Sequence, residues 1–130
     1  MKQLQFDRLS NEVIGCALDV HRELGPGFLE KAYRNAMRIA LSRAGLEFLS
    51  ESRIVVTYQG IEVCTHQVDL VVRNELIVEL KAVKALSEVH FSQLRSYLKA
   101  TKLTVGLLIN FNTPRLEVRR LVNRFADITV

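Results

Sequence analysis

The feature that most constrains the fold of this chain is a pair of short apolar runs joined by three polar residues. The runs cover residues 68–72 and 76–81, and Arg73-Asn74-Glu75 separates them. Apolar, largely β-branched residues on both sides of a three-residue polar loop predict a β-hairpin. Because the runs are apolar at nearly every position, we expect both strands to be covered on both faces.

The same hairpin carries charged side chains in a place where charge is costly. With Asn74 at the apex, Asp69 lies opposite Glu79, and strand alternation puts Lys81 on the same face as Glu79. Two opposed carboxylates in an apolar sheet repel each other and lose hydration. A shared Mg²⁺ and the lysine would offset that cost, because Mg²⁺ takes one or two protein carboxylates and keeps room for water and phosphate. The alternative is an ordinary salt bridge at a strand end.

Length and composition indicate one globular domain, residues 1–130, with a substantial core. The chain is 48% hydrophobic and 25% charged. The longest apolar run, 103–111, is too short to cross a membrane, and the amino terminus lacks the apolar segment of a secretory signal. We therefore expect a cytoplasmic protein with no membrane partner. Cys16 and Cys64 have no CxxC spacing, which favours free thiols over a zinc or iron–sulfur site.

The positive charge is unevenly distributed along the chain. The net charge is +4, and all of the excess lies in residues 66–130, which hold ten basic and six acidic residues. A positive field around a metal site suits a polyanionic substrate. Solvated arginines on a surface helix or an edge strand would give the same count.

Apolar periodicity and turn residues divide the rest of the chain into elements. We expect Asp7 or Ser10 to begin the first helix, Gly25-Pro26-Gly27 to end it, Gly45 to end the second helix and Ser87 to cap the third. The resulting order of two helices, three strands, a helix and two strands predicts a mixed sheet flanked by helices, of the α+β or α/β class. The expected helices cover 7–24, 29–44 and 88–100, and the expected strands cover 54–58, 61–72, 76–81, 103–111 and 116–122.

Two helices carry polar residues at spacings that place them together. Glu30 lies in a first helical turn, where the helix dipole favours a carboxylate, and Tyr33 follows on the same face. His90, Gln93 and Tyr97 lean in one direction from the third helix. Each residue also has an ordinary structural explanation, as a helix-start glutamate, a core aromatic, a partly exposed histidine or a glutamine bonded to backbone.

Taken together, these stretches resemble the GxxExxY family, a branch of the PD-(D/E)XK nuclease-like superfamily. The resemblance covers about residues 7–123. It implies a restriction-endonuclease-like core with a helix, a three-stranded antiparallel meander, a crossover helix and a further strand. Val68 stands where the superfamily usually has proline. The similar segments are residues 20–33, Asp69, residues 76–83, residues 93–97 and residues 106–111.

The resemblance also implies roles for individual residues. Asp69 and Glu79 would bind the metal ion, with the backbone carbonyl of Leu80 as a further ligand. Lys81 would be the active-site lysine, and Glu30 would be the acid that the first core helix supplies, as a direct or water-mediated metal ligand. The residues expected to shape the site or contact the substrate are Gln93, Tyr97, His21, His90 and Tyr33.

The function hypothesis is Mg²⁺- or Mn²⁺-dependent hydrolysis of phosphodiester bonds in nucleic acid, with DNA favoured over RNA. A second hypothesis is a non-catalytic nucleic-acid-binding or scaffolding module on a nuclease fold, which would bind with salt-sensitive affinity. A third is an enzyme acting on phosphate esters of small nucleotides. Kinship of fold alone does not establish cleavage. An edge strand or an exposed helix face leaves a homodimer open.

Overall fold

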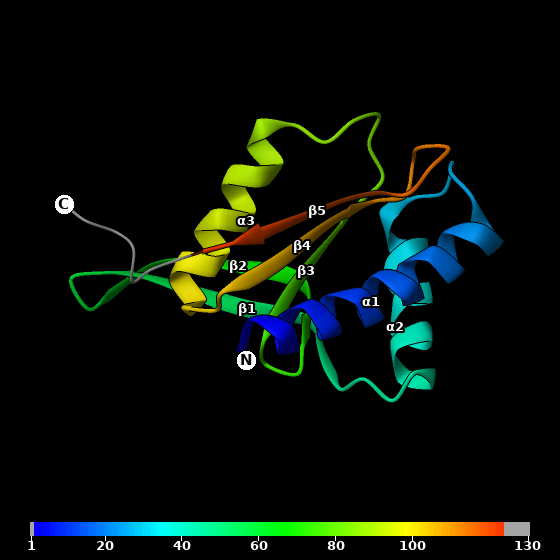
Figure 1. Ribbon diagram of the computed structural model, residues 1–130. Helices are drawn as coiled ribbons and strands as arrows, with labels where there is room; N and C mark the ends of the chain where they lie inside the picture. Colours follow the sequence, from blue (N-terminus) through cyan, green and yellow to red (C-terminus); the bar gives the residue numbers. More distant parts are fainter. Residues whose placement is uncertain (1, 124–130) are drawn as a thin grey trace.

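The computed structural model describes residues 2–123, with side chains described from Asp7 onward. The order of elements is the one the sequence predicts (Figure 1). Within the described residues, no helix is both long and apolar enough to cross a membrane. The elements are α1 (Lys2–Leu24), α2 (Glu30–Arg43), β1 (Phe48–Tyr58), β2 (Ile61–Val72), β3 (Leu76–Lys81), α3 (Glu88–Thr101), β4 (Val105–Asn110) and β5 (Glu117–Val122).

The strands form one mixed sheet in the order β1-β2-β3-β4-β5. The first three strands are an antiparallel meander, and α3 then crosses over so that β4 runs parallel to β3. β5 returns antiparallel to β4 and lies at the edge of the sheet. This arrangement confirms the predicted mixed sheet with a central meander and flanking helices.

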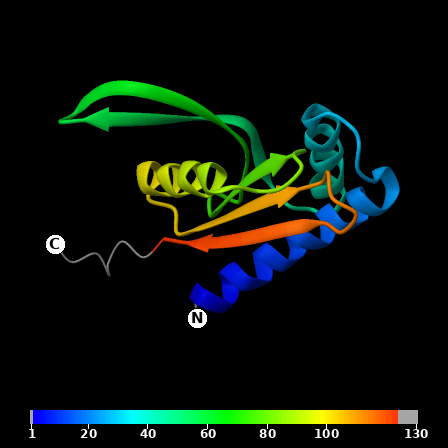
Figure 2. The same cartoon turned by 90° about the horizontal axis from the view of Figure 1, so that it is seen from above.

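Helices cover both faces of the sheet. α1 and α2 pack on one face, where Tyr33, Met37 and Leu41 of α2 are fully buried. α3 packs on the other face through Leu94, Tyr97 and Leu98 (Figure 2). Because apolar side chains point to both faces, all six residues of β4 are buried, as expected for a strand covered on both sides.

β2 pairs with β1 along its length but with β3 only at its end. Only Leu70, Val71 and Val72 pair with β3. The rest of β2 pairs with β1 in a long hairpin that curls over α3, so that α3 lies between this hairpin and the remaining strands (Figure 2). The sheet therefore splits directly before Leu70.

The turns explain why the hairpins form. Gln59 and Gly60 both have positive φ, 50° and 78°, as a two-residue type I′ turn requires. Arg73 and Asn74 also have positive φ, and the N–H of Glu75 donates to the carbonyl of Val72 at 3.0 Å. The pairing of Val72 with Leu76 that follows confirms the register predicted from an apex at Asn74.

Two predicted element starts differ from the structure by five residues or more. α1 begins at Lys2 rather than at residue 7, so Asp7 and Ser10 lie inside the helix. The carboxylate of Asp7 pairs instead with Arg120 of β5 and ties the two elements together. β1 begins at Phe48 rather than at residue 54, because the polar residues 50–53 occupy an exposed strand that still pairs with β2.

Substitution of Gly106 tests the packing of α3 on the sheet, and substitution of Gly15 is its control. A methyl group at Gly106 of β4 would come within 2.9 Å of Leu94, whereas one at Gly15 of α1 would meet nothing within 4 Å. Gly106→Ala should lower the free energy of unfolding by about 1–3 kcal/mol because the core is overpacked. Gly15→Ala should raise it by about 0.5–1 kcal/mol through helix propensity. Urea unfolding checks both, and an unaffected Gly106→Ala would contradict the contact between α3 and β4.

Candidate active site

Asp69 and Glu79 lie where β2 and β3 separate. The regular ladder ends at the pair Leu70–Val78, and side chains then replace backbone groups as hydrogen-bond partners. The N–H of Asp69 donates to Oε1 of Glu79 at 2.8 Å, and the N–H of Leu80 donates to Oδ2 of Asp69 at 2.8 Å. Since buried N–H groups need partners, these two bonds satisfy the open end of the ladder and hold the carboxylates side by side.

Glu79 is an acid in an unfavourable environment. Its side chain is only 8% exposed. Burial, then the negative charge of Asp69 and, to a smaller extent, that of Glu30 raise the pKa of Glu79 from 4.5 to about 7. The hydrogen bond from the Asp69 backbone and the charge of Lys81 act in the opposite direction. Near neutral pH this carboxyl group therefore responds strongly to any added charge.

The positive charge that contacts Asp69 belongs to a residue outside the set predicted from the sequence. Nε of Arg34, on α2, donates to Oδ1 of Asp69 at 3.0 Å. A second nitrogen of the same guanidinium lies 3.7 Å from a carboxylate oxygen of Glu51 on β1. The position of Arg34 one helical turn after Glu30 is the signal that could have identified it, because residues four apart share a helix face.

Glu51 has an unusual backbone conformation. Its φ is +53°, although it lies within β1, between the ladder pairs Ser50–Leu70 and Ser52–Val68. The left-handed region costs a non-glycine residue about 1–2 kcal/mol. Directly across the ladder lies Asp69, and the packing of β2 changes there: Leu70 faces α1 and α2, whereas Val68 faces α3. The kink at Glu51 thus accompanies the turn of the hairpin over α3.

Lys81 and Glu30 approach the carboxylate pair from two sides. Lys81 follows Glu79 by two residues on β3 and is half-buried beside Asn110 of β4. Glu30 is half-buried at the start of α2. Their charges shift the pKa of Glu79 in opposite directions, down for Lys81 and up for Glu30, so both act on the same carboxylate.

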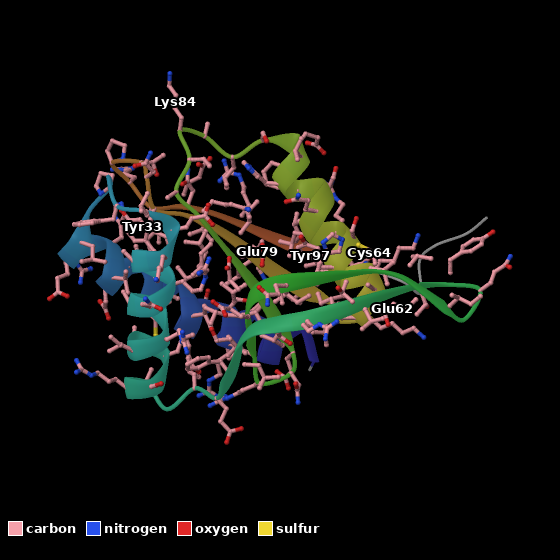
Figure 3. All side chains as sticks on the ribbon, turned by 180° about the vertical axis from the view of Figure 1, so that it is seen from behind. Tyr33, Glu62, Cys64, Glu79, Lys84 and Tyr97 are labelled. Carbon is pink, nitrogen blue, oxygen red and sulfur yellow. The ribbon has the colours of Figure 1, made fainter. Side chains whose placement is uncertain are left out.

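Tyr97 of α3 also lies near the Asp69–Glu79 carboxylate pair. Its pKa is raised by burial, then by the charges of Glu79 and Asp69, and then by Cys64. Its ring centroid lies 5.3 Å from that of His66 on β2. Figure 3 shows Tyr97 beside Glu79, behind the β1–β2 hairpin. Gln93, one turn earlier on α3, is exposed.

The other aromatic and histidine residues expected at the site make structural contacts. Tyr33 stacks on Phe111 with 4.6 Å between ring centroids, its hydroxyl donates to the carbonyl of Gly25, and it lies apart from Glu79 in Figure 3. Nε2 of His21 lies 2.9 Å from the carbonyl oxygen of Thr113. His90 completes a capping box in which its Nδ1 accepts from the N–H of Ser87 at 3.0 Å. These contacts hold loops and a helix start.

The donor set fits a hard divalent cation better than zinc. Among residues 2–123, no group of three or more His, Cys, Asp or Glu side chains has the arrangement of a complete metal site. Asp69, Glu79 and the carbonyl of Leu80 offer only oxygen, and Mg²⁺ often binds proteins through one or two carboxylates. The mutual repulsion that raises the pKa of Glu79 would also be relieved by a cation. These residues therefore fit Mg²⁺ or Mn²⁺.

Comparison with known families agrees with this fold. A family model described as the PD-(D/E)XK nuclease superfamily matches residues 7–121. The chain belongs to this superfamily. The sequence matches no curated protein.

Two solved structures are similar to this chain. The crystal structure of a protein called SSO0001 has a TM-score of 0.57 at 17% identity and covers 71% of this chain and 48% of its own. The alkaline exonuclease LHK-Exo from Laribacter hongkongensis has a TM-score of 0.50 at 12% identity, with coverages of 71% and 55%. The chain thus spans about half the length of each. At these identities the similarity shows the fold.

The raised pKa of Glu79 predicts how stability depends on pH. Between about pH 4.5 and 7 the folded protein binds more protons than the unfolded chain, so stability falls as the pH rises through this window. Glu79→Gln cannot ionise and can still accept the Asp69 N–H. With chelator present, it should match wild type below pH 4.5 and exceed its free energy of unfolding by on the order of 3 kcal/mol above pH 7.

Denaturant unfolding across the pH range measures this difference. Glu75→Gln, in the exposed hairpin loop, is the matched control and should follow wild type at every pH. A difference between Glu79→Gln and wild type that does not change with pH would contradict the assignment.

Proposed function

We propose that this chain is a divalent-metal-dependent nuclease that hydrolyses phosphodiester bonds, with DNA favoured over RNA as its substrate. We further propose that it belongs to the GxxExxY branch and that residues 1–130 form a single nuclease-like domain. The observation that carries the proposal is the carboxylate pair Asp69–Glu79, held by reciprocal hydrogen bonds where the sheet splits. Membership of the PD-(D/E)XK superfamily supports it, and the similar LHK-Exo is described as an alkaline exonuclease.

In this proposal the metal-binding residues are Asp69, Glu79, the carbonyl of Leu80 and, directly or through water, Glu30. When bound, Mg²⁺ or Mn²⁺ supplies Lewis-acid chemistry, because a divalent ion activates water and offsets negative charge on a phosphate. The donors are oxygen atoms on two adjacent strands and the start of α2. Because hydrogen bonds already hold the two carboxylates in place, metal binding would lose little conformational entropy in ordering them.

Lys81 would act on the phosphate itself. Its side chain alternates onto the same face of β3 as Glu79, and its ammonium could donate to a phosphate oxygen whose negative charge grows in the transition state. Tyr97 and Gln93 would position nucleic acid from α3, with the Tyr97 ring supported by His66. Tyr33, His21 and His90 would act only through the loops and the helix start that they hold.

One observation favours the alternative of a non-catalytic nucleic-acid-binding module. Both oxygens of Asp69 already accept hydrogen bonds from the protein, Oδ1 from Arg34 and Oδ2 from Leu80. A chain in which this arrangement is permanent would bind nucleic acid with salt-sensitive affinity and leave it intact.

A cleavage assay on single- and double-stranded DNA and RNA with Mg²⁺ or Mn²⁺ tests the proposal. Glu79→Gln and Lys81→Met should each lower the cleavage rate by roughly 100-fold or more, because each removes charge stabilisation at the reacting phosphate. Glu75→Gln and Lys84→Met, exposed neighbours with the same charge changes, should cleave like wild type.

Cleavage that survives in Glu79→Gln would overturn the assignment of the site. Salt-sensitive binding of nucleic acid by wild type without any cleavage would favour the binding module. Turnover confined to mononucleotides would favour an enzyme of small phosphate esters.

A further inference from the structure

The carboxylate of Asp69 already has a cation beside it, and that cation belongs to the protein. Nε of Arg34 lies 3.0 Å from Oδ1, while Oδ2 is bonded to the backbone N–H of Leu80. The bond to Leu80 is part of the strand split and cannot be given up without leaving a backbone donor unpaired. Oδ1 is therefore the oxygen of Asp69 that is not tied to the strand split, and Arg34 is bonded to it.

A guanidinium and a divalent cation on one carboxylate oxygen repel each other. The Asp69 side chain is 14% exposed and that of Arg34 is 24% exposed. At such depth solvent and salt screen charges less than they do at the surface. The positive charge of Arg34 would therefore oppose binding of a metal ion at Asp69 and Glu79, and movement of Arg34 away from Asp69 would relieve this repulsion.

Glu51 is a second acidic partner for Arg34. Its carboxylate is already 3.7 Å from the guanidinium and its side chain is 53% exposed, so it is within reach of the arginine on the solvent-exposed side. Glu51 is also the residue of β1 with φ of +53°. Strained backbone that a fold retains at a site is a reason to look for function there.

We propose that Arg34 is an internal counter-cation: it occupies Asp69 when the site holds no metal ion and transfers to Glu51 when one binds. This inference rests on the metal site of the proposed function and adds a control of that site. Arg34 keeps the buried carboxylate pair compensated in the metal-free protein and raises the metal concentration needed for loading. Glu51 lowers the cost of releasing Asp69.

Titration of the full chain with Mn²⁺, followed by the electron paramagnetic resonance signal of free Mn²⁺, tests the proposal without measuring activity. Arg34→Met should bind Mn²⁺ at least tenfold more tightly than wild type, because the competing cation is gone. Arg38→Met is the matched control: an exposed arginine one turn later on α2, whose removal changes the net charge equally. It should shift the affinity less than twofold. An equal change of Mn²⁺ affinity in Arg38→Met and Arg34→Met would contradict competition between Arg34 and the metal ion for Asp69.

A double-mutant cycle isolates the transfer to Glu51. Glu51→Gln should weaken Mn²⁺ binding several-fold when Arg34 is present. It should have no effect in Arg34→Met, because no guanidinium is left to pair with the Glu51 carboxylate. If the loss of a negative charge alone explained the effect, it would persist unchanged in Arg34→Met, and that result would overturn the transfer. Weaker binding in Arg34→Met would show that Arg34 merely orients Asp69.

Arg34→Lys keeps the positive charge but lacks the planar, forked guanidinium that engages both carboxylates. It provides a second test should Arg34→Met unfold, and its Mn²⁺ affinity should lie between those of wild type and Arg34→Met. An Arg34→Lys affinity equal to or below that of wild type would then overturn the inference. Mn²⁺ binding by wild type with unchanged affinity in Arg34→Met would overturn this inference and leave the proposed function standing. Failure of wild type and every variant to bind Mn²⁺ would overturn both.

Discussion

The structure depends on an exchange of hydrogen bonds at the point where the sheet divides. Beyond Leu70 and Val78 the two backbones move apart, and N–H groups would be left without partners. The side chains of Asp69 and Glu79 accept those hydrogen bonds, each from the opposite strand. One feature therefore ends the ladder, leaves β2 to continue with β1 over α3 and holds two carboxylates near each other.

This arrangement sets the charge balance of the site. The pair cannot be moved apart without breaking the bonds that end the ladder, so its repulsion and burial appear in the raised pKa of Glu79. Lys81 lies on the same strand, and Arg34 reaches Asp69 from the α2 side while also approaching Glu51. The site combines a hydrogen-bonded acidic pair with an arginine side chain that lies between Asp69 and Glu51. That combination is suited to exchanging one cation for another.

The sequence predicts the parts of this structure that depend on local pattern. The two apolar runs and the polar triplet around Asn74 are sufficient for the hairpin, its register and the opposition of Asp69 and Glu79. Arg34 and Glu51 escaped prediction because their roles arise from contacts between α2, β2 and β1. Nothing local marks Glu51 for a left-handed conformation that glycine or asparagine would adopt more readily. The early start of β1 was missed for a related reason, since its polar residues show no apolar alternation.

If the strand split is a site for a divalent cation whose place Arg34 holds in the metal-free protein, a bound cation should displace the guanidinium. A crystal structure of the protein grown with Mn²⁺, with anomalous diffraction to locate the metal, tests it most directly. One manganese peak is expected between the carboxylates of Asp69 and Glu79, with the guanidinium of Arg34 turned to Glu51. Manganese elsewhere, or no peak while Arg34 still contacts Asp69, would contradict it.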